Sequence, residues 1–161
     1  MALAYLMARQ YDAAITDATQ RLESTPNDAW LHYNLAIAYH CTGKDKESVE
    51  RLAQFFSLIS MPEYAESLRH AFEHGGYDAI LRAEIHGMEH QPPGQYLSVV
   101  ELAGLYAQLG QREKALSLLE EGYSQHSPLL LDIQNECSFD LLHNNERYRA
   151  LIKKIGLPPA W

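Results

Sequence analysis

The sequence predicts an all-α fold built from pairs of antiparallel helices. Apolar residues recur at helical spacing along most of the chain. A pattern of tyrosine, glycine and small residues returns with a period of 34 residues, which is typical of stacked helix pairs. Glycine and proline stand where the apolar stripes end, as expected at helix boundaries. We expect about seven or eight helices from these stripes.

The bulk composition is that of a water-soluble globular protein. The 161 residues suffice for one domain with a sizeable core, and 47% are hydrophobic. A net charge of -8 and the lack of any basic run argue against a general binder of phosphate backbones, so we expect no direct binding to nucleic acid. The same charge disfavours docking on anionic lipid. No apolar run has the length of a bilayer span, so we expect no membrane insertion.

The cysteine content points to a reducing compartment. Cys41 and Cys137 are the only two cysteines, and they lie far apart in unrelated motifs. We therefore expect no disulfide framework and a cytoplasmic location. A transmembrane segment upstream of this chain would instead allow an extracytoplasmic location.

The 34-residue period is anchored by tyrosines. Tyr5 and Tyr39 lie 34 residues apart, and Tyr106 follows after a further 67. Four residues after each tyrosine stand Arg9, Gly43 and Gly110. Glycine at such a position permits the left-handed backbone of a tight turn between two helices.

Small residues keep the same offsets from these tyrosines. They precede the tyrosine at Ala2, Ala36 and Ala103 and follow it at Ala14, Ser48 and Ala115. Antiparallel helices approach closely only where small side chains face each other, so Ala14, Ala36, Ala103 and Ala115 are the predicted contacts within the pairs.

The pattern divides the chain into five segments of a single domain. Residues 1–26 form a truncated first repeat that ends at Pro26, and residues 27–60 form the second. Residues 61–93 form a non-standard helical hairpin, and residues 95–128 form the third repeat. Residues 129–161 form a C-terminal cap, because a stack of helix pairs needs a terminal element with one polar face.

The third and last segments carry their own signals. In the hairpin, an apolar stripe at Tyr64, Leu68 and Phe72 is broken by Gly75-Gly76, and Tyr77 restarts a helix. Pro92-Pro93-Gly94 then forces a loop. In the cap, residues 132–142 look irregular or short-helical, and Asn144-Asn145-Glu146 looks like a helix start. That helix is expected to end at Gly156 and Pro158-Pro159.

These spacings resemble the tetratricopeptide repeat family, whose signature is W-x2-L-G-x2-Y, then A-x3-F, then P. The chain departs from it at His32 and Val99, where the family prefers Trp, and has Ala where the family prefers Gly. The resemblance implies an α-solenoid, a right-handed superhelix of antiparallel helix pairs with a C-terminal capping helix. It also implies a non-catalytic scaffold whose concave groove binds a protein or peptide.

From about Tyr96 to Pro158 the chain resembles a narrower group. It is similar to the C-terminal repeat region of bacterial multidomain transcriptional regulators and Ser/Thr kinases. The matching strings are LYAQLG (105–110), ALSLLE (115–120), SFDLL (138–142) and RYRALIKKIGLP (147–158). The chain departs from the group at Glu136-Cys137, where Asp-Pro is usual. The resemblance implies a part of a bacterial signalling or transcription-regulating protein, with any DNA-binding or kinase domain upstream.

The candidate partner-binding residues lie on the first helix of the second repeat. Side chains not needed for packing within that pair cluster at helical spacing. They are Trp30, Tyr33, Asn34, Ile37, His40 and Cys41. Aromatic rings beside an amide suit a peptide groove. Two alternatives stay open. In one, Trp30 and Ile37 simply pack on a neighbouring helix pair; in the other, the groove closes on a small ligand as a sensor domain.

A metal-dependent hydrolase is the third class considered. His70-Ala71-Phe72-Glu73-His74 and His86-Gly87-Met88-Glu89-His90 both fit H-x-x-E-H, a zinc-peptidase motif. Neither pair has an evident third ligand, so we interpret the histidines as surface and helix-capping residues. Nucleophile elbows and phosphate loops are absent from the sequence. We therefore expect no enzyme activity, no catalytic residues, no metal and no cofactor.

The truncated first repeat leaves one side of the predicted stack open. An uncapped end of such a stack exposes apolar surface, which favours pairing with a second copy. We therefore expect possible homodimer formation through residues 1–20.

Overall fold

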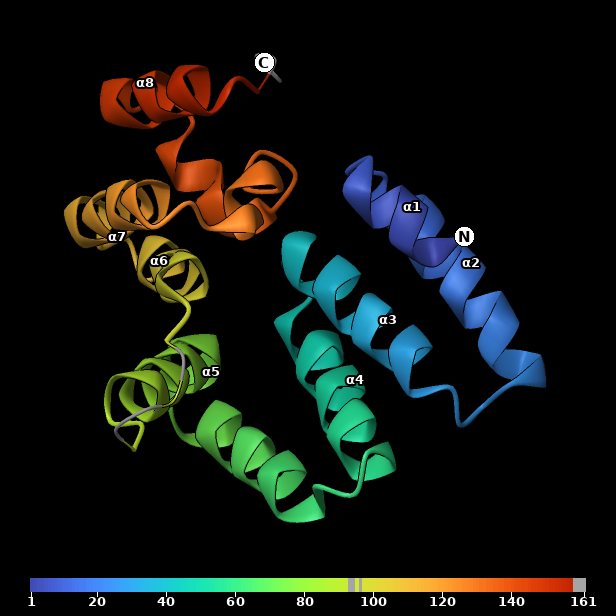
Figure 1. The fold of residues 1–161 in the computed structure, drawn as a ribbon. Coiled ribbons are helices and arrows are strands. Elements are labelled where there is room, and N and C mark those ends of the chain that lie inside the picture. Colours follow the sequence, from blue (N-terminus) through green and yellow to red (C-terminus); the bar gives the residue numbers. More distant parts are fainter. Residues whose placement is uncertain (93–94, 96, 158–161) are drawn as a thin grey trace. The chain divides into compact units, whose positions relative to one another are not determined.

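The computed structural model describes residues 1–92, 95 and 97–157, and these are all-helical, as predicted (Figure 1). None of them lies in a β-strand. The α-helices are α1 (Ala2–Met7), α2 (Tyr11–Ser24), α3 (Ala29–Cys41), α4 (Asp45–Leu58), α5 (Pro62–Glu89), α6 (Val99–Gln108), α7 (Arg112–Ser124) and α8 (Glu146–Ile155). Two 3-10 helices, η1 (Pro128–Leu131) and η2 (Cys137–Leu142), stand between α7 and α8.

The chain divides into two compact units, Met1–Ile80 and Leu81–Trp161. The division falls within α5. Each unit is therefore described by itself, and the superhelix stays a prediction. The predicted loop at Pro93-Gly94, the start of the narrower resemblance at Tyr96 and the helix end at Pro158-Pro159 lie outside the described residues.

The turns inside three helix pairs share one geometry. The carbonyl of Tyr39 accepts a hydrogen bond from the Lys44 amide at 2.9 Å, across a turn in which Gly43 has φ +72°. The Tyr106 carbonyl and the Gln111 amide make the same bond at 2.9 Å around Gly110, again at φ +72°. This six-residue bond satisfies a carbonyl that the helix end would otherwise leave unpaired.

The α1–α2 turn achieves the same bond without glycine. The Gln10 amide donates to the Tyr5 carbonyl at 2.8 Å, and Arg9 takes the left-handed conformation at φ +57°. A side chain at this φ is strained relative to glycine. This turn therefore makes the same backbone hydrogen bond as the other two, but with a strained backbone conformation at Arg9.

The small residues of the repeat pattern are buried. The four predicted contact positions, Ala14, Ala36, Ala103 and Ala115, are at most 2% exposed. Ala2 and Ser48, which keep the same offsets, are each 1% exposed. The burial agrees with the packing role that their spacing predicts.

The core of the first unit consists of three apolar clusters. Leu31 and Leu35 of α3 pack with Ala18 of α2 in one of them. Val49 of α4 packs with Leu68 and Ile80 of α5 in another. At the start of α3, an Asp28 carboxylate oxygen accepts a hydrogen bond from the Leu31 amide at 3.2 Å, which caps the helix.

Helix α5 is broken where the sequence predicts a break. Gly75 (φ -157°, ψ 16°) and Gly76 (φ 66°, ψ -165°) depart from helical geometry. Gly76 lies in a region that only glycine enters readily. A Cβ atom added to Gly75 would lie 2.8 Å from the Cβ atom of Ala79. Both glycines are therefore required for the local break in α5.

The second unit is built around a single large core. Phe139 of η2 and Tyr148 of α8 are fully buried in it, together with leucines of α6 and α7. The Tyr148 hydroxyl donates to the Ile133 carbonyl at 3.0 Å, which ties α8 to the segment between η1 and η2. The C-terminal segment is thus packed into the core as a helical element.

Helix α8 has clear ends and an ionic tie to α7. The Asn145 side chain caps its start by accepting from the Arg147 amide at 2.8 Å, and Gly156 ends it at φ 86°. The Arg147 guanidinium donates to both carboxylate oxygens of Glu120 at 3.1 and 2.9 Å, and to Glu113 at 2.7 Å. The Arg147 side chain holds the pKa of Glu120 below its usual value.

Two further findings bear on the sequence predictions. The described part of the chain contains no free cysteine, which contradicts the expectation of a chain without disulfide bonds, and the cytoplasmic location stays a prediction. No helix in the described ranges combines the length and apolar character needed to span a bilayer.

Candidate functional site

The predicted partner-binding residues all lie on α3 in the first unit. Trp30 is in the first turn of the helix and is 66% exposed, although it is the largest side chain on α3. The other five, Tyr33, Asn34, Ile37, His40 and Cys41, are half-buried. An exposed tryptophan among ordered neighbours is the feature that needs a physical explanation.

Trp30 is held by other aromatic rings. Its ring centroid lies 5.9 Å from that of Tyr33 in an edge-to-face arrangement. The Phe55 ring of α4 lies 5.5 Å from Trp30 and 5.1 Å from Tyr33. These distances are those of favourable aromatic pairs, so the exposed indole is supported on one side by rings of two helices.

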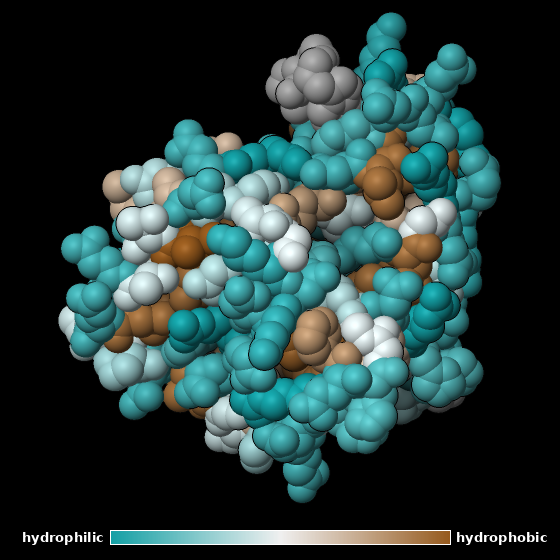
Figure 2. Space-filling model, turned by 180° about the vertical axis from the view of Figure 1, so that it is seen from behind, coloured by the Kyte–Doolittle hydropathy of each residue, from teal (hydrophilic) through white to brown (hydrophobic). Residues whose placement is uncertain are grey.

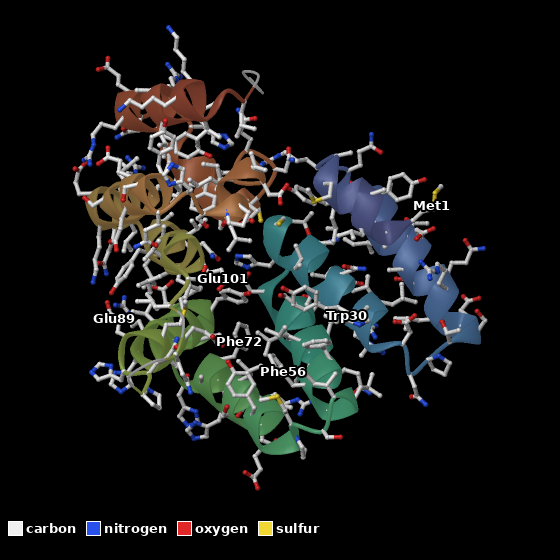
Figure 3. All side chains as sticks on the ribbon, in the orientation of Figure 1. Met1, Trp30, Phe56, Phe72, Glu89 and Glu101 are labelled. Atoms are coloured by element: carbon white, nitrogen blue, oxygen red, sulfur yellow. The ribbon has the colours of Figure 1, made fainter. Side chains whose placement is uncertain are left out.

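The row of rings continues into α5. Phe56 lies 5.0 Å from Phe55, and Tyr64 of α5 lies 4.4 Å from Phe56. We call Trp30, Tyr33, Phe55, Phe56 and Tyr64 the aromatic row. Figure 3 labels Trp30 on α3 and Phe56 on α4, the two helices between which the row begins. Trp30 is its exposed end, since Phe55 is 7% exposed and the remaining members are half-buried.

The remaining predicted residues do not extend this row. Ile37 packs on the cluster formed by Leu6, Ala14 and Ala38, so it follows the alternative of packing on a neighbouring pair. The His40 ring stacks on Tyr77 at 4.1 Å, and its Nδ1 lies 3.0 Å from an Asp45 carboxylate oxygen. Cys41 is not a free thiol.

Sequence reasoning missed the members of the row on α4 and α5. Phe55, Phe56 and Tyr64 belong to apolar stripes whose spacing predicts burial and nothing more. The adjacent pair Phe55-Phe56 was the available signal, because consecutive residues on a helix point about 100° apart and two such rings reach different neighbours.

The first H-x-x-E-H segment is an exposed helix end. His70, Glu73 and His74 are all exposed on α5, just before the glycine break. The His74 Nδ1–H donates to the His70 carbonyl at 2.8 Å. This bond satisfies a carbonyl near the end of the helical segment, in agreement with the interpretation of His74 as a capping residue.

In the second H-x-x-E-H segment, the glutamate side chain is already hydrogen-bonded. Glu89 accepts hydrogen bonds from the Tyr106 hydroxyl and, at 3.0 Å, from the Lys114 ammonium group. The Tyr106 hydrogen bond and the Lys114 group hold the pKa of Glu89 below its usual value. A general base needs a pKa near the working pH, so Glu89 is tuned in the opposite direction.

The histidines, cysteines and carboxylates do not form a larger cluster. Within residues 1–92, 95 and 97–157, no three or more such side chains are placed to share one ion.

Comparison with known proteins adds no relative. Models of known protein families, characterised proteins and solved structures all give no match to this chain. The functional argument consequently rests on the residues and their geometry.

Proposed function

We propose that this chain is a non-catalytic protein–protein interaction module of the tetratricopeptide kind. The observation that carries the proposal is the exposure of Trp30 at the end of the aromatic row. The Trp30 indole is 66% exposed, so most of its apolar surface is in contact with water in the free protein. A partner that covers this surface gains the hydrophobic free energy of its burial.

The surroundings of Trp30 favour a protein or peptide partner. Tryptophan and tyrosine are enriched among the residues that dominate binding energies at protein interfaces. Because Tyr33 and Phe55 already contact the indole, little side-chain entropy remains to be lost when a partner binds. On the face shown in Figure 2, apolar surface appears as separate patches within a hydrophilic surround.

The origin of the module forms a second part of the proposal. The resemblance of residues 96–158 to repeat regions of bacterial regulators supports a place in a signalling or transcription-regulating protein. In that setting the chain would act as a scaffold that recruits a partner, with no reaction of its own.

A capture experiment tests the interaction. The chain, a Trp30→Ala variant and a Tyr123→Ala variant are used as baits in bacterial lysate. Tyr123 is the matched control, because it is a 42% exposed aromatic residue in the second unit. We expect a protein that the parent and Tyr123→Ala retain and Trp30→Ala loses, with the affinity lowered about 30-fold for a dominant anchor.

The variants are first shown to be folded by circular dichroism. Equal retention of every captured protein by parent and Trp30→Ala would contradict a partner site at the aromatic row. Loss with both variants would point to general destabilisation or to a broad apolar adhesion rather than to a site at Trp30.

A further inference from the structure

Two histidine pairs, one within α5 and one at its C-terminal end, have similar geometry. His70 and His74 are four residues apart and exposed, with ring centroids 4.1 Å from each other. His86 and His90 repeat the spacing and the exposure, with centroids 4.0 Å apart. The first pair belongs to the first unit and the second pair to the second unit.

A backbone hydrogen bond fixes the tautomer of one ring in each pair. His74 Nδ1 lies 2.8 Å from the His70 carbonyl oxygen, and His90 Nδ1 lies 2.9 Å from the His86 carbonyl oxygen. A carbonyl only accepts, so each Nδ1 carries the proton, and the Nε2 atom of the neutral ring presents its lone pair. Metal-binding histidines are typically oriented by such a bond from the other ring nitrogen.

We propose that His70–His74 and His86–His90 are two separate surface sites for a divalent transition-metal ion. Two imidazoles one helical turn apart lie on the same face and can bind one ion together. Imidazole suits copper, nickel, cobalt and zinc, whereas magnesium and calcium prefer oxygen ligands. Water molecules complete the coordination, because no third protein ligand lies near either pair among the described residues.

This chemistry differs from that of a zinc peptidase. The sites hold an exchangeable ion through two ligands, and neither needs the glutamate of the H-x-x-E-H segment. Glu89 is engaged by Tyr106 and Lys114 and thus stays outside the second site. The proposal is independent of the partner site at Trp30.

Calorimetric titration of the full chain with nickel chloride provides the test. We expect two ions per chain for the parent, one for His74→Gln, one for His90→Gln and none for the double variant. At the altered pair, the single remaining histidine should bind nickel at least about tenfold more weakly. Loss of a residue that only hydrogen-bonds to a metal ligand already lowers metal affinity by about tenfold or more. Magnesium chloride should give no binding signal.

His126→Asn is the matched control. His126 is an exposed histidine with φ 55°, a conformation that asparagine also tolerates, so the substitution removes one imidazole without new strain. We expect this variant to bind two ions like the parent. Circular dichroism establishes that all variants retain their helix content.

Three outcomes would overturn the proposal. Nickel binding that survives in the double variant would place the sites elsewhere. Loss of one ion in His126→Asn would show that isolated surface histidines suffice. A single ion that disappears in either His74→Gln or His90→Gln would contradict two separate sites.

Discussion

Gly76 is the single position at which backbone geometry leaves least choice of residue. Its φ of 66° and ψ of -165° belong to a region that is essentially restricted to glycine. We expect Gly76→Ala to lower the free energy of unfolding by about 1–3 kcal/mol, the usual cost of such strain. Urea unfolding followed by circular dichroism measures this difference.

Gly87 supplies the control within the same helix. It lies in the second half of α5, has a negative φ, and an added Cβ atom would meet nothing within 4 Å. Gly87→Ala should therefore raise the stability by about 0.5–1 kcal/mol, because alanine favours a helix more than glycine does. Equal effects at both positions would contradict the assignment of strain to Gly76.

Single residues also show how far the sequence alone could predict the candidate site. The position of Trp30 on a helix follows from the pattern of α3, but the sequence left open whether Trp30 and Ile37 face a partner or pack on a neighbouring helix pair. The structure separates the two, since Trp30 is exposed and Ile37 packs on the cluster around Leu6. The ring contact of Trp30 with Phe55 depends on how α3 and α4 cross, which residue spacing within one helix does not determine.

At the scale of elements, a polar network joins α5, α6 and α7 in the second unit. The Lys114 ammonium group lies 3.0 Å from Glu89 and 3.9 Å from the ring centre of Tyr106. Tyr106 and Lys114 lower the pKa of Glu89 from its usual value of 4.5. A carboxyl group whose pKa is lowered by folding stabilises the protein above its unfolded-state pKa and loses that contribution as the pH falls.

Acid titration should reveal this network. We expect the parent to lose stability from about pH 5 downward, because Glu89 must take up a proton against its hydrogen bonds. Glu89→Gln should be less stable than the parent at pH 7 and should lose less on acidification. The difference will be small, since the Glu89 side chain is 35% exposed and solvent screens the ion pair.

The measurement is the urea midpoint of each protein at pH 7 and pH 4. Glu23→Gln, which neutralises an exposed carboxylate on α2, serves as the control and should shift in parallel with the parent. If Glu89→Gln also kept the full acid sensitivity, the network would not contribute to the pH dependence.

The elements themselves were largely predictable. The glycine break in α5, the start of α8 at Asn145 and its end at Gly156 follow from residues with strong local preferences. The two 3-10 helices were expected only as irregular or short-helical structure, because short turns of this kind carry no long apolar period. Arg9 at φ 57° agrees with its alignment on Gly43, although arginine itself does not predict that conformation.

At the scale of the whole molecule, the 34-residue period predicts that helix pairs follow one another along the chain. It gives little information about how the chain divides into compact units. The division between Ile80 and Leu81 falls inside an apolar stripe of α5, where composition and loop signals give no boundary. Contacts distant in sequence determine such a division. Local patterns therefore predict the helix pairs better than they predict the two units.

The expected self-association through residues 1–20 also concerns the whole molecule. Helix α1 and the Met1 residue that precedes it expose three large apolar side chains, Met1 at 74%, Leu3 at 61% and Met7 at 41%. A stable dimer buries about 800 Å² on each partner, which three side chains on a six-residue helix do not supply. We therefore expect weak pairing, with a dissociation constant of about 0.1–1 mM, corresponding to roughly 4–5.5 kcal/mol.

Sedimentation equilibrium over a range of concentrations measures this association. Leu3→Lys should abolish it, because a charged side chain would have to lose its hydration in the interface. Leu131→Lys is the matched control, since Leu131 is a similarly exposed leucine, at 58%, in the second unit. A chain that stays monomeric at millimolar concentration, or a dimer that only Leu131→Lys disrupts, would show that the apolar face of α1 does not pair.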